Sequence, residues 1–229
     1  MQARRLDHAN RHPIRRRTRS RGAALLLAAG TLGACSKKEP QPVSLLFEGD
    51  SDIEGWDTDQ YPDSANVGVG GAVCGDVLDA LAETLDVYQP DRVVLVCGEN
   101  DLWDQSVGKT FGDFSAIVSD IQKSGATVYY MGTKPEPLTT ELHTEYRQYD
   151  DMIRQHALEL ATDAHAPLVM IDVYTGFEAL GNPDELYQRD QLHLSQAGYD
   201  LWDAWLTAAF DDEQCIVWES AVCQEPLRP

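Results

Sequence analysis

The run Arg92-Val93-Val94-Leu95-Val96-Cys97 passes directly into Gly98-Glu99-Asn100-Asp101, so a strongly apolar stretch gives way to a polar one. A short, valine-rich apolar run is typical of a strand buried on both faces of a parallel sheet. Three other runs have this character, and they span residues 43–47, 127–131 and 168–172. Apolar residues recur at helical spacing between and after these runs, in the segments 75–87, 110–124, 142–164 and 196–210.

Strands that alternate with helices of this length predict an α/β fold, in which helices cover both faces of a central parallel sheet. Ligands bind such sheets at the carboxyl ends of the strands. We therefore expect the functional residues to follow the predicted strands directly.

Three polar motifs stand at or near these strand ends. Gly49-Asp50-Ser51 ends the first strand, residues 66–71 form a glycine-rich loop, and Asn100 follows the strand at 92–97. A serine in a tight strand-to-helix turn can act as a nucleophile, while backbone and asparagine N–H groups can bind an oxyanion. Taken alone, each motif is also explained as an ordinary turn or helix cap.

A fourth motif, Asp190-Gln191-Leu192-His193, precedes the last predicted helix. A carboxylate three residues before a histidine can curl back onto one imidazole nitrogen. That contact fixes the tautomer and leaves the other nitrogen free as a base. The pair is therefore a candidate for acid–base catalysis.

In their order and spacing, the four motifs together resemble those of the SGNH (GDSL-type) hydrolases, and the resemblance covers about residues 43–210. Within that family the chain is most similar to the branch with platelet-activating-factor acetylhydrolase-type members. The resemblance implies a three-layer, flavodoxin-like α/β fold with a central parallel sheet. It also implies two-step acyl transfer from an ester, with no metal and no other cofactor.

Carried over residue by residue, the resemblance implies that Ser51 is the nucleophile, His193 the general base and Asp190 the acid that orients it. The backbone N–H groups of Ser51 and Gly71 and the side chain of Asn100 are expected to form the oxyanion hole.

Acidic residues near these motifs depart from the family pattern. Asp52 stands where the name-giving motif has leucine, and Glu48 and Glu99 add further carboxylates at the strand ends. If these groups face the cleft, anionic substrates would be disfavoured.

Three aromatic residues follow the motifs and could either line an acyl or sugar pocket or belong to the core: Trp56, Tyr61 and Trp103.

The amino-terminal segment is typical of a secretory signal. Residues 1–34 hold eight arginines, one acidic residue and an apolar stretch that ends in small residues. Leu32-Gly33-Ala34-Cys35 resembles a bacterial lipobox, so we expect a signal peptide over 1–34, lipidation of Cys35 and a polar tether over 35–42. This predicts an exported cell-envelope lipoprotein, at the outer membrane, that meets the membrane through its lipid anchor alone. A plain signal peptide with an incidental cysteine is the alternative.

The charge of the chain excludes one class of partner. The 229 residues carry 18 basic and 38 acidic side chains, a net charge of −20, and after residue 34 only 10 bases stand against 37 acids. Such a surface repels phosphate backbones, so nucleic acid is excluded as a partner. The sequence leaves the oligomeric state open.

Four cysteines remain besides Cys35, an even number that suits disulfides in an oxidising compartment. Cys215 and Cys223 could pin the carboxyl-terminal tail, residues 211–229, as a local loop. Cys74 and Cys97 could form a second bridge if their segments meet, or could be small buried apolar residues.

Three functions fit these observations. The first is a serine hydrolase that cleaves a carboxylic ester with a small or medium acyl group. The second is a carbohydrate O-deacetylase acting on cell-envelope or environmental polysaccharide. The third is a catalytically silent surface lipoprotein that serves as a binding scaffold. The complete set of predicted catalytic residues favours an enzyme, but thioesterases and lysophospholipases share this fold and chemistry.

Overall fold

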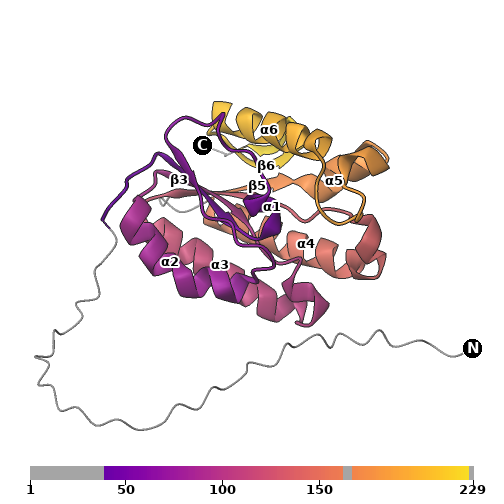
Figure 1. The fold of residues 1–229 in the computed structure, drawn as a ribbon, viewed down its shortest axis with the longest axis horizontal. Helices are drawn as coiled ribbons and strands as arrows, with labels where there is room; N and C mark the ends of the chain where they lie inside the picture. Colours follow the sequence, from indigo (N-terminus) through magenta and orange to yellow (C-terminus); the bar gives the residue numbers. More distant parts are fainter. Residues whose placement is uncertain (1–38, 162–166, 227–229) are drawn as a thin grey trace, which may run out of the picture. The chain divides into compact units, whose positions relative to one another are not determined.

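The computed structural model describes residues 39–161 and 167–226, which belong to one compact unit. Seven described strands form one sheet in the order β2-β1-β3-β4-β5-β6-β7 (Figure 1). Neighbouring strands are parallel from β2 to β6, and the last pair is antiparallel. The strands are β1 (Leu45–Gly49), β2 (Ser64–Asn66), β3 (Arg92–Val96), β4 (Thr127–Met131), β5 (Leu168–Asp172), β6 (Cys215–Glu219) and β7 (Val222–Pro226).

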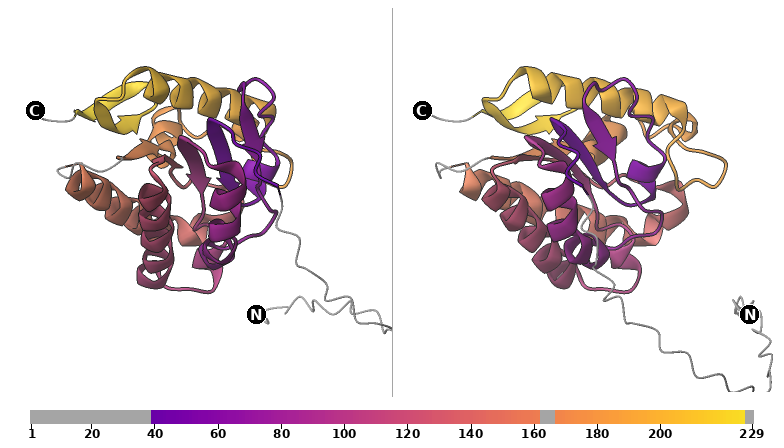
Figure 2. Two further views of the ribbon diagram at one scale, coloured as in Figure 1. Left: turned by 90° about the vertical axis from the view of Figure 1, so that its left-hand side faces the viewer. Right: turned by 60° about the vertical axis from the view of Figure 1, so that its left-hand side comes forward.

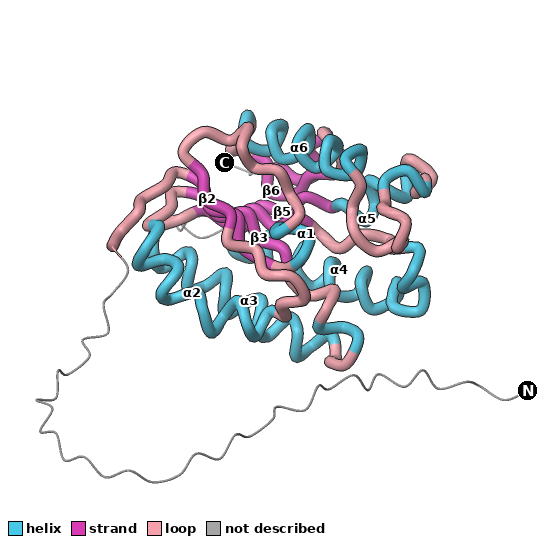
Figure 3. Tube along the Cα trace, viewed as in Figure 1, coloured by secondary structure: helices cyan, strands magenta, loops and turns pink. Residues whose placement is uncertain are grey.

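Helices cover both faces of this sheet and so make three layers (Figure 3). On one face lie α2 (Cys74–Tyr88), α3 (Val107–Ser124) and α4 (His143–Leu160). On the other lie α6 (Gln196–Asp211) and the short helices α1 (Ser51–Glu54) and α5 (Val173–Ala179). Short 3-10 segments span Asp101–Trp103, Pro137–Leu142 and Asp184–Leu186.

The central strands are apolar throughout because both of their faces are buried. Side chains alternate along a strand, so Leu46 and Leu95 pack against the α2–α3–α4 layer while Phe47 and Val96 pack against the α6 layer. All four predicted strands and all four predicted helices are confirmed, with ends shifted by a few residues. The predicted α/β fold with a central parallel sheet is confirmed as well.

The carboxyl-terminal segment differs from the expected tail. Residues 215–226 form a hairpin whose first strand, β6, pairs in parallel with β5 and so extends the sheet. Figure 2 shows this hairpin, coloured yellow, beside α6. The run Cys215-Ile216-Val217-Trp218 is buried there, so the sheet does not stop at residue 210. An apolar run too short to be diagnostic by itself explains why the sequence did not indicate this strand.

Both expected disulfides are present. Cys215 and Cys223 bridge the two strands of the hairpin, and Cys74 at the start of α2 is joined to Cys97 just after β3. The second bridge ties a helix start to a strand end at the edge of the sheet where ligands are expected. Both cysteines of that bridge are buried.

The chain enters the domain at the end of the sheet where the strands begin, opposite the end that carries Ser51. The backbone N–H of Gln41 donates to the carbonyl of Val87 at 2.7 Å, and that of Val43 donates to Tyr88 at 2.9 Å. These bonds hold the entering segment against the carboxyl end of α2, beside the beginning of β3.

No helix in the part of the chain that the structure describes is both long and apolar enough to cross a membrane. The predicted signal peptide and Cys35 lie outside the described residues.

The two disulfides should differ in their contribution to stability. Cys74 and Cys97 are 23 residues apart and Cys215 and Cys223 only 8. Because a longer closed loop restricts the unfolded chain more, replacing the first pair by alanine should lower the free energy of unfolding by about 3.4 kcal/mol and the second by about 2.5 kcal/mol. Urea denaturation without reductant measures both values. Unfolding curves that match the wild type would contradict this prediction.

Candidate active site

Ser51 lies where β1 turns into α1, and Gly49 makes this turn possible. Gly49 has φ +153°, and a Cβ atom there would lie 2.2 Å from the carbonyl oxygen of Val96 on β3, so a larger residue would clash with the neighbouring strand. Asp50 caps α1, since its carboxylate accepts from the backbone N–H of Asp52 at 2.9 Å. Ser51 therefore begins the helix at the carboxyl end of β1.

Asp190 and His193 form the contact that the sequence predicts. His193 Nδ1 lies 2.7 Å from Asp190 Oδ2, while the backbone N–H groups of Leu192 and His193 each donate to Asp190 Oδ1 at 3.1 Å. Slight burial of Asp190 works against its ionisation, but these hydrogen bonds outweigh it and hold the pKa of Asp190 below its usual value. The ionised carboxylate thus holds the imidazole at Nδ1, and no described residue bonds to Nε2.

Ser51 and His193 line one small cleft together with Asn100, Trp103 and Leu192. Its enclosed volume is only about 10 Å³. Within the described residues Ser51 Oγ makes no hydrogen bond to His193. Catalytic hydrogen bonds are often longer in an unliganded enzyme than in its complex with substrate.

The expected oxyanion donors are arranged around this turn. No described residue accepts a hydrogen bond from the backbone N–H of Ser51 or of Gly71. The side chain of Asn100 donates to the carbonyl of Ala72 at 3.0 Å and, at 3.5 Å, to Asp50. Asn100 is thereby held beside the loop that carries Gly71. Gly71 itself lines a neighbouring groove rather than the cleft of Ser51.

A buried lysine beneath the cleft joins the loops after three strands. Lys134 Nζ lies 2.6 Å from Asp52, 2.5 Å from Glu99 and 2.6 Å from Glu136. The backbone N–H of Lys134 also donates to Glu99, at 2.6 Å. All four side chains are buried. Burial alone would lower the pKa of Lys134, but the surrounding carboxylates hold it well above its usual value, so it stays charged.

This lysine also takes the place that a metal ion could occupy. Carboxylates of Asp50, Asp52 and Glu99 lie within 4.8 Å of one another, close enough to share a cation. The ammonium of Lys134 already contacts two of them. Burial and the charge of Asp52 raise the pKa of Asp50 to about 8, so Asp50 is largely protonated at neutral pH.

The acidic residues therefore do not simply surround the cleft with negative charge. Asp52 and Glu99 turn toward Lys134, which offsets part of their charge. Glu48 points to the other side of β1, toward α2, and is only 4% exposed. Burial raises the pKa of Glu48 to about 8, and its Oε2 has no hydrogen-bond partner in the described chain.

One of the three aromatic residues reaches the cleft. Trp103 lines it and is 49% exposed. Trp56 and Tyr61 instead pack against Phe47 on the α6 side of the sheet, and both donate to Asp203 at 2.8 Å. These two residues therefore belong to the core and its rim.

The sequence matches the model of a known enzyme family. The model of the GDSL-like lipase/acylhydrolase family matches residues 49–201, about two thirds of the sequence. The chain belongs to this family, as its motifs predicted, and is thus an ester hydrolase. No curated protein matches the sequence.

Several solved structures share the fold. A lipase/acylhydrolase from Enterococcus faecalis is 20% identical, with a TM-score of 0.59 over 71% of this chain and 92% of that one. A psychrotrophic esterase from Pseudoalteromonas is 19% identical, with a TM-score of 0.54 over 73% and 96%. A Streptococcus pneumoniae protein whose name refers to platelet activating factor is 24% identical, with a TM-score of 0.56 over 72% and 81%.

Sequence reasoning did not identify Lys134 and Glu136 as parts of the site floor. The sequence predicts their stretch, Lys134-Pro135-Glu136-Pro137, as a loop on the cleft side because it follows a predicted strand, but it does not predict the charge cluster. The usable signal was a lysine shortly after the end of a strand. Two of its three partners, Glu99 and Asp52, are however 35 and 82 residues away in the sequence.

Removing the charge of Lys134 should destabilise the protein strongly. Lys134→Met leaves buried carboxylates without their cation, so the free energy of unfolding should fall by about 3–5 kcal/mol. Lys123→Met, which breaks an exposed ion pair with Asp120, should cost less than about 1 kcal/mol. Urea denaturation compares the two variants, and equal losses would contradict the prediction.

The raised pKa of Glu48 predicts that Glu48→Gln increases the free energy of unfolding by an amount that depends on pH. Between about pH 4.5 and 8 the folded state keeps Glu48 protonated while the unfolded state ionises it, so wild-type stability falls as pH rises. The variant does not lose stability in this way. Its free energy of unfolding, relative to that of the wild type, should therefore rise by at most about 1.4 kcal/mol per pH unit. Denaturation at pH 5, 6, 7 and 8 measures the gain, with the exposed Glu141→Gln as control. A difference that does not change with pH would refute the assignment.

Proposed function

We propose that this protein is a serine hydrolase that cleaves carboxylic esters with small acyl groups through Ser51, His193 and Asp190. The observation that carries the proposal is the 2.7 Å contact between His193 Nδ1 and Asp190, in a loop whose histidine lines the same cleft as Ser51. Membership in an acylhydrolase family supports the same reaction class.

The reaction would proceed in two steps. His193 Nε2 takes the proton of Ser51 as Oγ attacks the ester carbonyl carbon, and it then gives that proton to the departing alcohol. Asp190 stabilises the imidazolium that forms between these transfers. Water, activated by the same histidine, attacks the acyl-enzyme and releases the carboxylic acid and free Ser51.

The negative charge on the carbonyl oxygen would be stabilised by three donors. The unpartnered N–H groups of Ser51 and Gly71 support this assignment, as does the position of Asn100 beside Ala72. Asn100 would exchange its long 3.5 Å contact with Asp50 for the substrate oxyanion.

The small cleft favours a short acyl group. The cleft beside Ser51 has a volume of only about 10 Å³ and so offers no pocket for a long acyl chain. The exposed ring of Trp103 at the same cleft gives a specific reason to keep carbohydrate O-deacetylation as a second candidate, because aromatic faces offer sugars a flat apolar surface.

We also propose that the protein is exported and lipidated at Cys35, at the outer membrane. Two disulfides within the described chain support export, because such bonds persist in oxidising compartments. Cys35→Ala should move the protein from the membrane fraction to the soluble fraction and abolish labelling by radioactive palmitate, whereas Ser36→Ala should keep the label. Labelled Cys35→Ala protein would refute lipidation.

Replacing the nucleophile tests the main proposal. Ser51→Ala should reduce hydrolysis of p-nitrophenyl acetate to the background rate, while Ser115→Ala, on the exposed side of α3, should keep wild-type activity. Rates on p-nitrophenyl esters from acetate to laurate should be highest for acetate, and acetylated xylan tests the deacetylase candidate. Full activity in Ser51→Ala would overturn the mechanism.

The oxyanion assignment makes a separate prediction. Asn100→Ala should lower kcat by about 10²–10³ while KM changes little, because the donor acts mainly in the transition state. Steady-state kinetics on p-nitrophenyl acetate separates the two constants. A variant with higher KM and unchanged kcat would assign Asn100 to substrate binding instead.

A further inference from the structure

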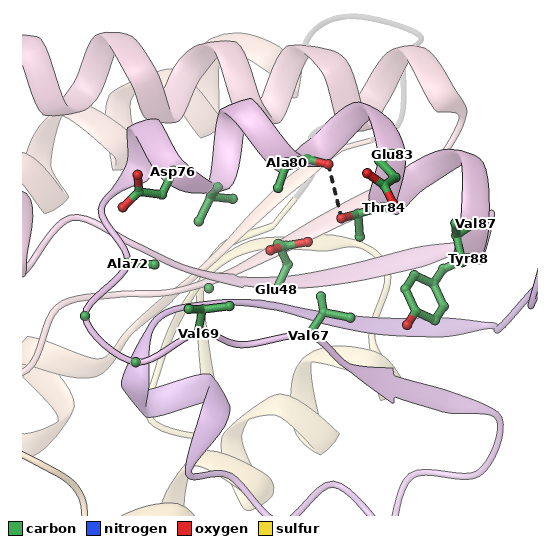
Figure 4. A pocket seen from close by; sticks show the side chains of 14 residues that line it. Glu48, Val67, Val69, Ala72, Asp76, Ala80, Glu83, Thr84, Val87 and Tyr88 are labelled. Atoms are coloured by element: carbon green, nitrogen blue, oxygen red, sulfur yellow. Dashed lines mark hydrogen bonds between the residues drawn. The ribbon is translucent and has the colours of Figure 1, made fainter. Parts of the chain in front are cut away.

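A second, larger groove lies directly beside the nucleophile's turn. Its volume is about 400 Å³, and it runs between α2 and the loop that follows β2 (Figure 4). Apolar side chains make most of its walls, among them Val67 and Val69 from the loop and Ala80 and Val87 from α2. Gly49 and Gly71 line its end nearest Ser51, so a bound molecule would lie close to the reacting serine.

The floor of this groove carries an unpartnered carboxylate. Glu48 projects from β1 into the space between the strand and α2 (Figure 4). It is 4% exposed, and no described residue donates a hydrogen bond to it. A buried polar group without a partner is costly unless a ligand or water supplies the missing contact.

The charge of the groove selects the type of ligand. Asp76 and Glu83 of α2 also line it, and none of the described lining residues is basic. Asp76 and Glu83 would repel a carboxylate ligand, and a purely apolar ligand would leave Glu48 Oε2 without a partner. An ammonium group with an apolar substituent would satisfy both the acidic floor and the apolar walls.

We propose that this groove binds an amphipathic organic cation, with the ammonium group at Glu48 and its alkyl chain along α2, and that it receives the cationic alcohol part of an ester cleaved at Ser51. The binding site stands on the groove alone, whereas its use by a substrate rests on the proposed esterase function. The bound cation would hold Glu48 ionised, in contrast to its protonated state in the empty groove.

Three ligands with the same six-carbon chain test the binding site: hexylammonium, 1-hexanol and hexanoate. Calorimetry on the full chain should show hexylammonium binding at least tenfold more tightly than hexanol, and no binding of hexanoate. Glu48→Gln should lower hexylammonium affinity at least tenfold, to that of hexanol. Equal affinity for hexylammonium and hexanol in the wild type, or no change in Glu48→Gln, would overturn the proposal.

A substitution at the rim of the groove tests the site without altering Glu48. Val69 lines the groove and is 60% exposed, so replacing it should leave the fold intact. Val69→Lys should weaken hexylammonium binding at least tenfold through charge repulsion, while the matched Val69→Gln should retain it. Equal affinities in these two variants would contradict a cation site.

Paired esters test the role of the groove in catalysis. The wild type should hydrolyse 6-aminohexyl acetate with a kcat/KM at least tenfold above that for hexyl acetate, and Val69→Lys should lose this preference. Hydrolysis without the preference would refute the substrate role and leave the esterase intact. Absence of hydrolysis of both esters would refute the esterase proposal, and binding to Ser51→Ala protein would then decide the groove by itself.

Discussion

The buried ammonium group of Lys134 holds together the loops that carry Ser51 and Asn100. Lys134, after β4, contacts Asp52 in the turn after β1 and Glu99 in the turn after β3. Those two turns also carry Ser51 and Asn100. Buried charges are expensive to desolvate, so such a cluster is retained only where each charge has close partners. The relative positions of Ser51 and Asn100 therefore depend on the contacts of Lys134 beneath them rather than on a contact between the two residues.

The two sides of the nucleophile's turn differ in charge balance. Toward β3 and β4, Lys134 offsets acidic neighbours, and Asp50 is largely neutral because of its raised pKa. Toward α2, no basic residue of the described chain lines the groove around Glu48, and this carboxyl group is neutral through protonation. Acidic residues at the end of β1 thus lie in two environments. On the α2 side, Glu48 Oε2 has no partner in the described chain, so a bound molecule could supply one.

Local sequence patterns predicted most of the fold, but they did not predict contacts between residues far apart in the sequence. Apolar runs such as 92–97 predict strands because both faces of a central strand are buried, and the Asp190–His193 contact is a three-residue local geometry. The sequence did not indicate the charge cluster of Lys134, because its partners come from other strand ends. Nor did it separate Trp103 at the cleft from Trp56 in the core, since both simply follow a motif. The strand β6 was missed because its apolar run is short and follows the last helix.

The hydrogen bonds of Gln41 and Val43 to the end of α2 fix where the described chain joins the sheet. They hold the incoming chain at the end of the sheet where the strands begin, whereas Ser51 lies just after the end of β1. The entering segment and Ser51 therefore lie at opposite ends of β1, so a change in the entering segment reaches the cleft only through β1 or α2.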